Sequence, residues 1–192
     1  MIGPDEVLAF WIDEVGPSGW YQGSEELDAK CREQFMPTYE AVANGARSLW
    51  LTYPTGVLAY LIVADQLPRN MFRNNAQSFA LDGIALAAAK SAVEKDWDLK
   101  IDEPARQFFY LPMMHSESLR DQDRCVRLMK ARLSGEGDGN LHHAMVHREI
   151  IRTYGRFPYR NEALGRVNTE SETKFLRENG YATLLNELAA NR

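Results

Sequence analysis

The sequence predicts an all-α protein of about eight or nine helices that pair as antiparallel hairpins. Apolar residues recur at helical spacing along most of the chain, and the alternation of Val, Ile and Thr that marks strands is missing almost everywhere. The predicted linkers are short, which favours antiparallel neighbours. A chain of 192 residues can bury a substantial core, so we expect a single all-helical domain over residues 1–192.

Four helices are expected in the first half of the chain, over residues 4–15, 24–43, 54–67 and 78–95. The first begins at Pro4 and stops at the Gly-Pro-Ser-Gly stretch after Val15. Ser24 is a suitable N-cap for the second, which Gly45 closes and Pro37 bends. The third is apolar nearly all round, so we place it centrally, and Pro68 ends or kinks it. The fourth is rich in alanine, which lets a neighbouring helix approach closely.

Five more helices are expected over residues 102–111, 118–133, 141–154, 169–178 and 181–190. Asp102 is the expected cap of the first of them, and a glycine-rich loop over residues 134–140 separates the second from the third. Gly155 ends the helix expected over residues 141–154. Thr169 and Glu172 have the spacing of a capping box, which predicts where the fourth begins.

Composition restricts the class of protein. The net charge of −5 argues against nucleic acid as a partner, because proteins that bind it usually present a basic face. No apolar run is long enough to span a membrane, and Asp5 and Glu6 stand where a signal peptide would carry positive charge. Cys31 and Cys125 have no metal-type or redox-type spacing, so we expect reduced structural thiols in a soluble, cytoplasmic protein.

Three short segments, residues 65–73, 109–117 and 154–161, combine aromatic or apolar residues with proline, arginine, carboxylates, asparagine or histidine. Polar groups among apolar ones must be paired to be tolerated, so these segments predict either a structural network or a binding site. We take ten residues of these segments and the helix between them as candidate ligand-binding residues: Asp65, Arg69, Asn70, Arg73, His115, Glu117, His147, Arg148, Arg156 and Arg160.

Each segment also has a structural explanation. Asp65 and Arg69 have the i,i+4 spacing of a helical ion pair, and Arg73 would stabilise a helix C-terminus. Arg156 and Arg160 follow a glycine and have rigid neighbours, so they suit two-pronged binding of carboxylate or phosphate, or equally of carboxylates in the same chain.

The histidines allow acid/base chemistry or a metal site. His115 precedes Glu117 by two residues, and a His beside a Glu can exchange protons near neutral pH. His143 and His147 lie one helical turn apart, which suits two metal ligands, but zinc needs a third that the spacing does not supply. Asp65, His115 or Glu117 would be the third ligand if the fold brings one of them near, which the spacing does not show, so we assign no metal and leave the cofactor unknown. Sequence signatures of serine hydrolases, P-loop proteins, dinucleotide-binding proteins and dithiol enzymes are absent, so enzymatic activity is left open.

The same three segments carry a family resemblance. The orders D-Q-x-P-R-N-x-x-R, F-x-Y-x-P-x-x-H-S-E and H-R-x-x-I-x-x-x-G-R-F-P-x-R-N, at residues 65–73, 108–117 and 147–161, resemble the bacterial family called domain of unknown function 924. The resemblance extends from Trp11 through Leu176. It implies stacked antiparallel helix pairs in a tetratricopeptide-like arrangement, and because the family has no established activity it assigns no catalytic residues.

Two functions follow as hypotheses. In the first, the arginines bind a small anionic ligand, the histidines and carboxylates orient it, and any catalysis would be hydrolysis or proton transfer with His115 or His147 as the base. In the second, the helix pairs form a scaffold for a protein partner, and the polar segments are purely structural. A purely structural network with neither role is the third reading of the same residues.

Overall fold

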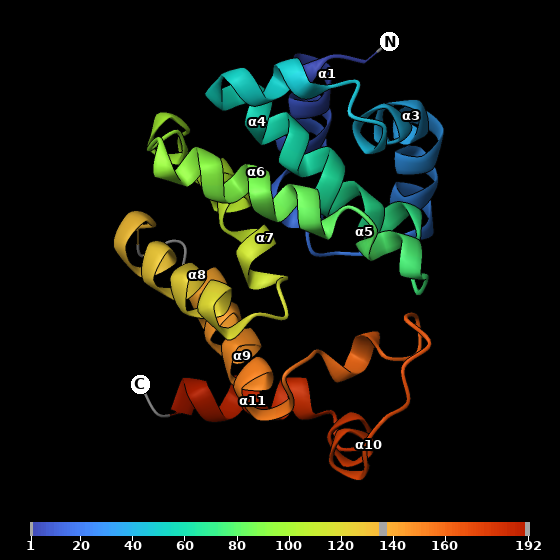
Figure 1. Ribbon diagram of the computed structural model, residues 1–192, viewed down its shortest axis with the longest axis vertical. Coiled ribbons are helices and arrows are strands. Elements are labelled where there is room, and N and C mark those ends of the chain that lie inside the picture. The colour runs from blue at the N-terminus through green and yellow to red at the C-terminus, as the bar shows by residue number, and fades with distance from the viewer. Residues whose placement is uncertain (1, 135–137, 191–192) are drawn as a thin grey trace. The chain divides into compact units, whose positions relative to one another are not determined.

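The computed structural model describes residues 2–134 and 138–190, and it is helical along most of these ranges (Figure 1). No strand occurs in either range, which confirms the all-α prediction. The chain divides into two compact units, Met1–Pro112 and Met113–Arg192. We call them the first and the second unit. A single domain over the whole chain stays a prediction, as does the tetratricopeptide-like stacking.

The first unit contains α-helices, 3-10 helices and two π-helical stretches. Its elements in order are α1 (Pro4–Leu8), η1 (Ala9–Val15), α2 (Gly16–Gly19), α3 (Glu25–Ala43), η2 (Ser48–Thr52), α4 (Pro54–Leu61), η3 (Ile62–Gln66), α5 (Leu67–Met71), η4 (Ala76–Phe79), α6 (Asp82–Glu94), η5 (Asp98–Lys100) and η6 (Ala105–Phe109). The short helix α7 (Leu111–Met114) crosses the boundary between the units.

Local sequence explains the helix ends that were predicted correctly. The Ser24 hydroxyl accepts a hydrogen bond from the Leu27 N–H at 3.1 Å, and α3 then runs to Ala43 as expected. Gly16 adopts φ +63°, which ends the first helical run at Val15. The stretch after it is a further helical turn, α2, where a loop was expected.

Pro68 does not end the central helix. The path from Pro54 to Met71 stays helical, and the π-helical stretch η3 lies directly before Leu67 and Pro68. A proline ring clashes with the carbonyl four residues earlier in an α-helix. The wider π-helical turn accommodates this residue, so the helix continues past it. The central placement is confirmed, because the residues of η3 are buried.

Two other predicted helices take a different form. The helix expected over residues 78–95 is divided into η4 and α6; Ala85 and Ala89 of α6 are buried, and α6 packs against α4. The helix expected over residues 102–111 is replaced by η6 and α7. Phe108, Phe109 and Tyr110 are all buried, and one face of an α-helix cannot bury three consecutive side chains.

The second unit consists of α8 (Leu119–Arg132), α9 (Asp138–Tyr154), η8 (Pro158–Arg160), α10 (Glu170–Arg177) and α11 (Gly180–Ala190). The consecutive helices α8 and α9 pack against each other, and α11 packs on α9 (Figure 1). Its core contains Val146, Ile150, Ile151, Phe157 and Phe175. Residues 135–137 of the predicted loop lie outside the described ranges, and α9 begins at Asp138, earlier than predicted.

Candidate functional site

The candidate residues are divided between the two units. Asp65, Arg69, Asn70 and Arg73 belong to the first unit, where they lie on η3, α5 and the turn after it. The other six candidates belong to the second unit, where they lie on α9 and on the segments before α8 and after α9. Each group is described within its own unit.

In the first unit, Arg73 binds a carboxylate that the sequence did not suggest. Its Nε and Nη2 donate to the two carboxylate oxygens of Asp28 on α3, at 2.8 and 2.7 Å. The Asn70 amide donates to the same carboxylate at 2.9 Å. The hydrogen bonds from Arg73 hold the pKa of the buried Asp28 below its usual range. This cluster therefore ties α5 to α3.

Arg69 is held by several groups of the first unit. Its Nη2 lies 3.6 Å from an oxygen of buried Asp65, the predicted i,i+4 partner, but only 2.7 Å from Asp82 of α6. Its Nη1 donates to the Ser78 carbonyl at 3.1 Å, and its guanidinium lies 4.8 Å from the ring centroid of Phe79. Arg69 thus fastens the segment between α5 and α6.

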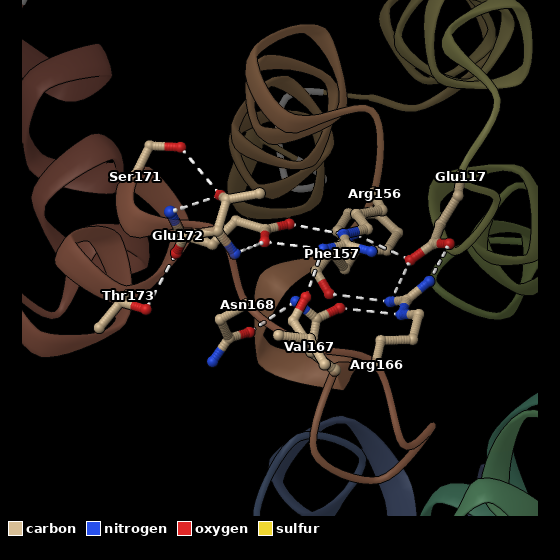
Figure 2. Close-up of polar contacts among 11 residues, drawn as sticks. Glu117, Arg156, Phe157, Arg166, Val167, Asn168, Ser171, Glu172 and Thr173 are labelled. Atoms are coloured by element: carbon tan, nitrogen blue, oxygen red, sulfur yellow. Dashed lines mark hydrogen bonds and ion pairs between the residues drawn. The ribbon is translucent and has the colours of Figure 1, made fainter.

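In the second unit, Glu117 binds the segment after α9 (Figure 2). Its oxygens accept from Arg166 Nη1 at 2.7 Å and Nη2 at 2.9 Å, and from the Phe157 N–H at 2.8 Å. Burial raises the pKa of Glu117, but these donors outweigh burial and hold the pKa below its usual value. Arg166 also donates to the Asn161 side chain at 2.8 Å, which closes the turn between these two residues within the segment.

A second ion pair, between Arg156 and Glu172, attaches the same segment to α10 (Figure 2). Arg156 Nε and Nη2 donate to the two oxygens of Glu172 at 2.6 and 2.8 Å, and Nη2 also donates to the Val167 carbonyl at 2.9 Å. Glu172 accepts from the Thr169 N–H at 2.7 Å in the predicted capping box. The hydrogen bonds from Arg156 lower the pKa of Glu172 to about 2. We call residues 155–169 the clamped segment.

His147 of α9 is the most perturbed histidine of the second unit. Its Nδ1 lies 2.9 Å from the His143 carbonyl, which can only accept, so Nδ1 carries the proton and Nε2 has a free lone pair. No described residue forms a hydrogen bond to Nε2. Burial, together with the repulsion from positive charge on His115, Arg160 and His143, lowers the pKa of His147 to about 3. The ring is therefore neutral at neutral pH.

Aromatic rings surround His147. The His147 ring centroid lies 5.3 Å from that of Phe157, 5.4 Å from that of Tyr181 and 6.4 Å from that of His115. The guanidinium of buried Arg160 lies 4.5 Å from the Phe157 ring centroid. The structure thus brings His115, His147 and Arg160 together. We call these three residues, with Phe157 and Tyr181, the histidine cluster.

Two further expectations concerned metals and thiols. Among residues 2–134 and 138–190, no group of three or more His, Cys, Asp or Glu side chains is arranged to hold a metal ion. His143 Nδ1 instead lies 2.7 Å from the Tyr181 hydroxyl. Cys31 and Cys125 are buried free thiols, as expected, and burial raises the pKa of both, that of Cys31 to about 12. Neither thiol is therefore ionised at neutral pH.

The remaining candidate, Arg148 on α9, lies 3.7 Å from Asp123 of α8. Within the described ranges, no helix is both long and apolar enough to cross a bilayer. Sequence reasoning did not predict Asp28, Asp82, Arg166 or Tyr181, which pair with residues of the motifs or line the histidine cluster. Only Arg166 gave a signal, because it is an arginine close to the third polar segment.

Comparison with known proteins places the chain among proteins without an assigned activity. The family model of DUF924, a bacterial protein of unknown function, matches residues 7–180. No curated protein matches the chain. A solved structure of a protein of unknown function from Agrobacterium tumefaciens is similar to this one, with 34% identity over 91% of this chain and 97% of that chain and a TM-score of 0.85. The likeness supports the helical fold and assigns no ligand.

Proposed function

Because the chain belongs to the DUF924 family of bacterial proteins of unknown function, we propose its function from the histidine cluster alone: it binds a small anion that also carries a hydrogen-bond donor. The observation that supports this proposal is His147, a neutral ring whose Nε2 has a free lone pair and which lies in one cluster with the guanidinium of Arg160. The guanidinium attracts the anion, and Nε2 accepts from its hydroxyl.

The other arginines have structural roles in this proposal. Arg69, Arg73 and Arg156 are each paired with a carboxylate of their own unit, so their charges are already compensated. They hold segments in place, and we assign Arg160 to the ligand because it lies in the histidine cluster, 4.5 Å from the Phe157 ring centroid.

Binding fits the histidine cluster better than acid/base catalysis by His147. A general base works best when its pKa lies near the operating pH, and a base with a pKa of about 3 is too weak for this. As a neutral acceptor, however, the ring suits a ligand that donates a hydroxyl proton. Inorganic phosphate has such a hydroxyl at neutral pH, whereas sulfate does not.

The test is isothermal titration of the full chain with phosphate and with sulfate. We expect phosphate to bind more tightly, Arg160→Gln to weaken both anions at least tenfold, and His147→Asn to reduce the preference for phosphate. If Arg160→Gln does not fold, His115→Asn takes its place. Arg152→Gln is the control, because Arg152 lies on the exposed side of α9 and pairs with Glu149. Equal binding by wild type and Arg160→Gln would contradict the proposal.

A second candidate function is the protein scaffold, which one observation favours. Val167 is 88% exposed near the C-terminal end of the clamped segment, which Arg156 and Arg166 hold in place. A rigid segment that presents an apolar side chain is suited to contact a partner. Capture of a partner from the native extract by wild type and by Val167→Ala, and its loss with Val167→Asp at unchanged Tm, would support this function. Retention of the partner by Val167→Asp would exclude this surface.

A further inference from the structure

The first unit contains an apolar cleft that the proposed function does not use. It has a volume of about 360 Å³, and η2, α4, α6 and the residue before η5 line it. Ile84, Ala88 and Ser91 line it from α6 at the i, i+4, i+7 spacing of one helical face. Because two of these three side chains are small, α6 leaves space beside α4 that larger residues would fill.

Tyr60 is the unusual residue of this cleft. It lines the cleft from α4 and is only 6% exposed, yet its hydroxyl forms no hydrogen bond to any described residue. Burial raises the pKa of Tyr60, so the hydroxyl keeps its proton and can donate. The hydroxyl oxygen is not among the fully buried polar atoms that lack a partner, so it keeps accessible surface and can donate to an acceptor on a ligand in the cleft.

Trp97 supplies an aromatic wall to the cleft. Its indole lines the cleft, and the Lys95 ammonium lies 4.5 Å from the Trp97 ring centroid. Aromatic and aliphatic lining with one or two polar groups is typical of sites for small organic molecules, and the volume is at the small end of such sites. It suits a single ring with a short substituent.

We propose that this cleft binds a small aromatic molecule that carries one hydrogen-bond acceptor, which the Tyr60 hydroxyl recognises. The apolar lining buries the ring, and the hydroxyl fixes its orientation. The site lies in the first unit and is separate from the histidine cluster of the second, so either can be correct without the other.

The test uses two probes of nearly equal shape, acetophenone and α-methylstyrene, of which only acetophenone has an acceptor oxygen. The readout is the NMR shift of alanine methyl groups in the full chain, with Ala88 and Ala92 as reporters in the cleft. We expect both probes to shift these methyl groups and acetophenone to bind more tightly. Tyr60→Phe should weaken acetophenone about three- to tenfold, the value of one hydrogen bond, and leave α-methylstyrene unchanged.

Variants that fill the cleft with a larger side chain test whether the probes bind there. Ala88→Leu should abolish binding of both probes, and Ala87→Leu, at an exposed position of the same helix, replaces it if Ala88→Leu does not fold. Wild-type binding by Ala88→Leu, or no methyl shift with either probe, would overturn the proposal. So would methyl shifts that depend on protein concentration without a probe, because a second copy of the chain would then occupy the cleft.

Discussion

Glu117 and Arg166 are 49 residues apart in the sequence, and their side chains form a two-pronged ion pair with distances of 2.7 and 2.9 Å. The same carboxylate accepts from the backbone of Phe157. The start of α8 and the clamped segment are therefore joined by one side chain. Two residues of the family motifs, Glu117 and Phe157, are in direct contact here, and Arg166, which the motifs do not include, binds both of them.

Glu117→Gln should lower the free energy of unfolding by about 1–3 kcal/mol, because it leaves Arg166 without its charged acceptor. Urea denaturation measures this change. Glu149→Gln removes an exposed pair with Arg152 and should cost at most about 0.5 kcal/mol. If the two variants lose the same free energy of unfolding, the Glu117–Arg166 pair stabilises the second unit no more than an exposed ion pair does.

Acid should weaken the attachment of α10. The pKa of Glu172 is about 2 in the folded chain and near its ordinary 4.5 in the unfolded chain. Its contribution to stability is therefore complete above pH 4.5 and is lost as the pH falls toward 2. Between pH 5 and pH 3, the Tm of wild type should fall more steeply than that of Glu172→Gln. Parallel curves of Tm against pH would show that Arg156 does not stabilise the Glu172 carboxylate.

The buried histidines predict a second dependence on pH. The pKa values of His143 and His147 lie below their usual 6.5 in the folded chain, so protons bind first to the unfolded chain. Stability is complete above pH 6.5 and falls below it by up to about 1.4 kcal/mol per pH unit for each histidine. The loss due to His147 continues toward pH 3. Urea denaturation at pH 7.0 and 5.5 should show a smaller loss for His147→Asn than for wild type.

Two helical glycines of the first unit should respond to alanine with opposite signs. A Cβ on Gly56 would overlap the Trp50 carbonyl oxygen, so Gly56→Ala forces the backbone apart and should cost about 1–3 kcal/mol. A Cβ on Gly83 meets nothing within 4 Å, so Gly83→Ala should add up to about 1 kcal/mol through helix propensity. If both variants lose stability, the contact of residue 56 with η2 does not explain the loss in Gly56→Ala.

Local signals were sufficient for several helices. Ser24 predicted the start of α3, and Thr169 with Glu172 predicted the start of α10, because a cap depends on residues within one turn. Propensity could not distinguish an α-helix from the 3-10 turns of η4 and η6, since their form depends on which consecutive side chains the rest of the unit buries.

The partners of the polar residues were less predictable. The i,i+4 contact of Asp65 with Arg69 was predicted, but Arg69 lies closer to Asp82, and Arg73 binds Asp28, 45 residues away. Such pairs depend on which helices pack together, and nothing in the local sequence encodes this. The residue types of the motifs predicted a buried polar network, while its connections required the three-dimensional structure.

The π-helical stretch η3 has a consequence for how the chain tolerates a change of length. Removing one residue from Ile62–Gln66 would let an ordinary α-helix form, but it would also rotate the following turn by roughly 100° about the helix axis. Asn70 and Arg73 would then no longer face Asp28. The extra residue of this turn therefore sets the rotation of the second half of the helix about the helix axis relative to the first half.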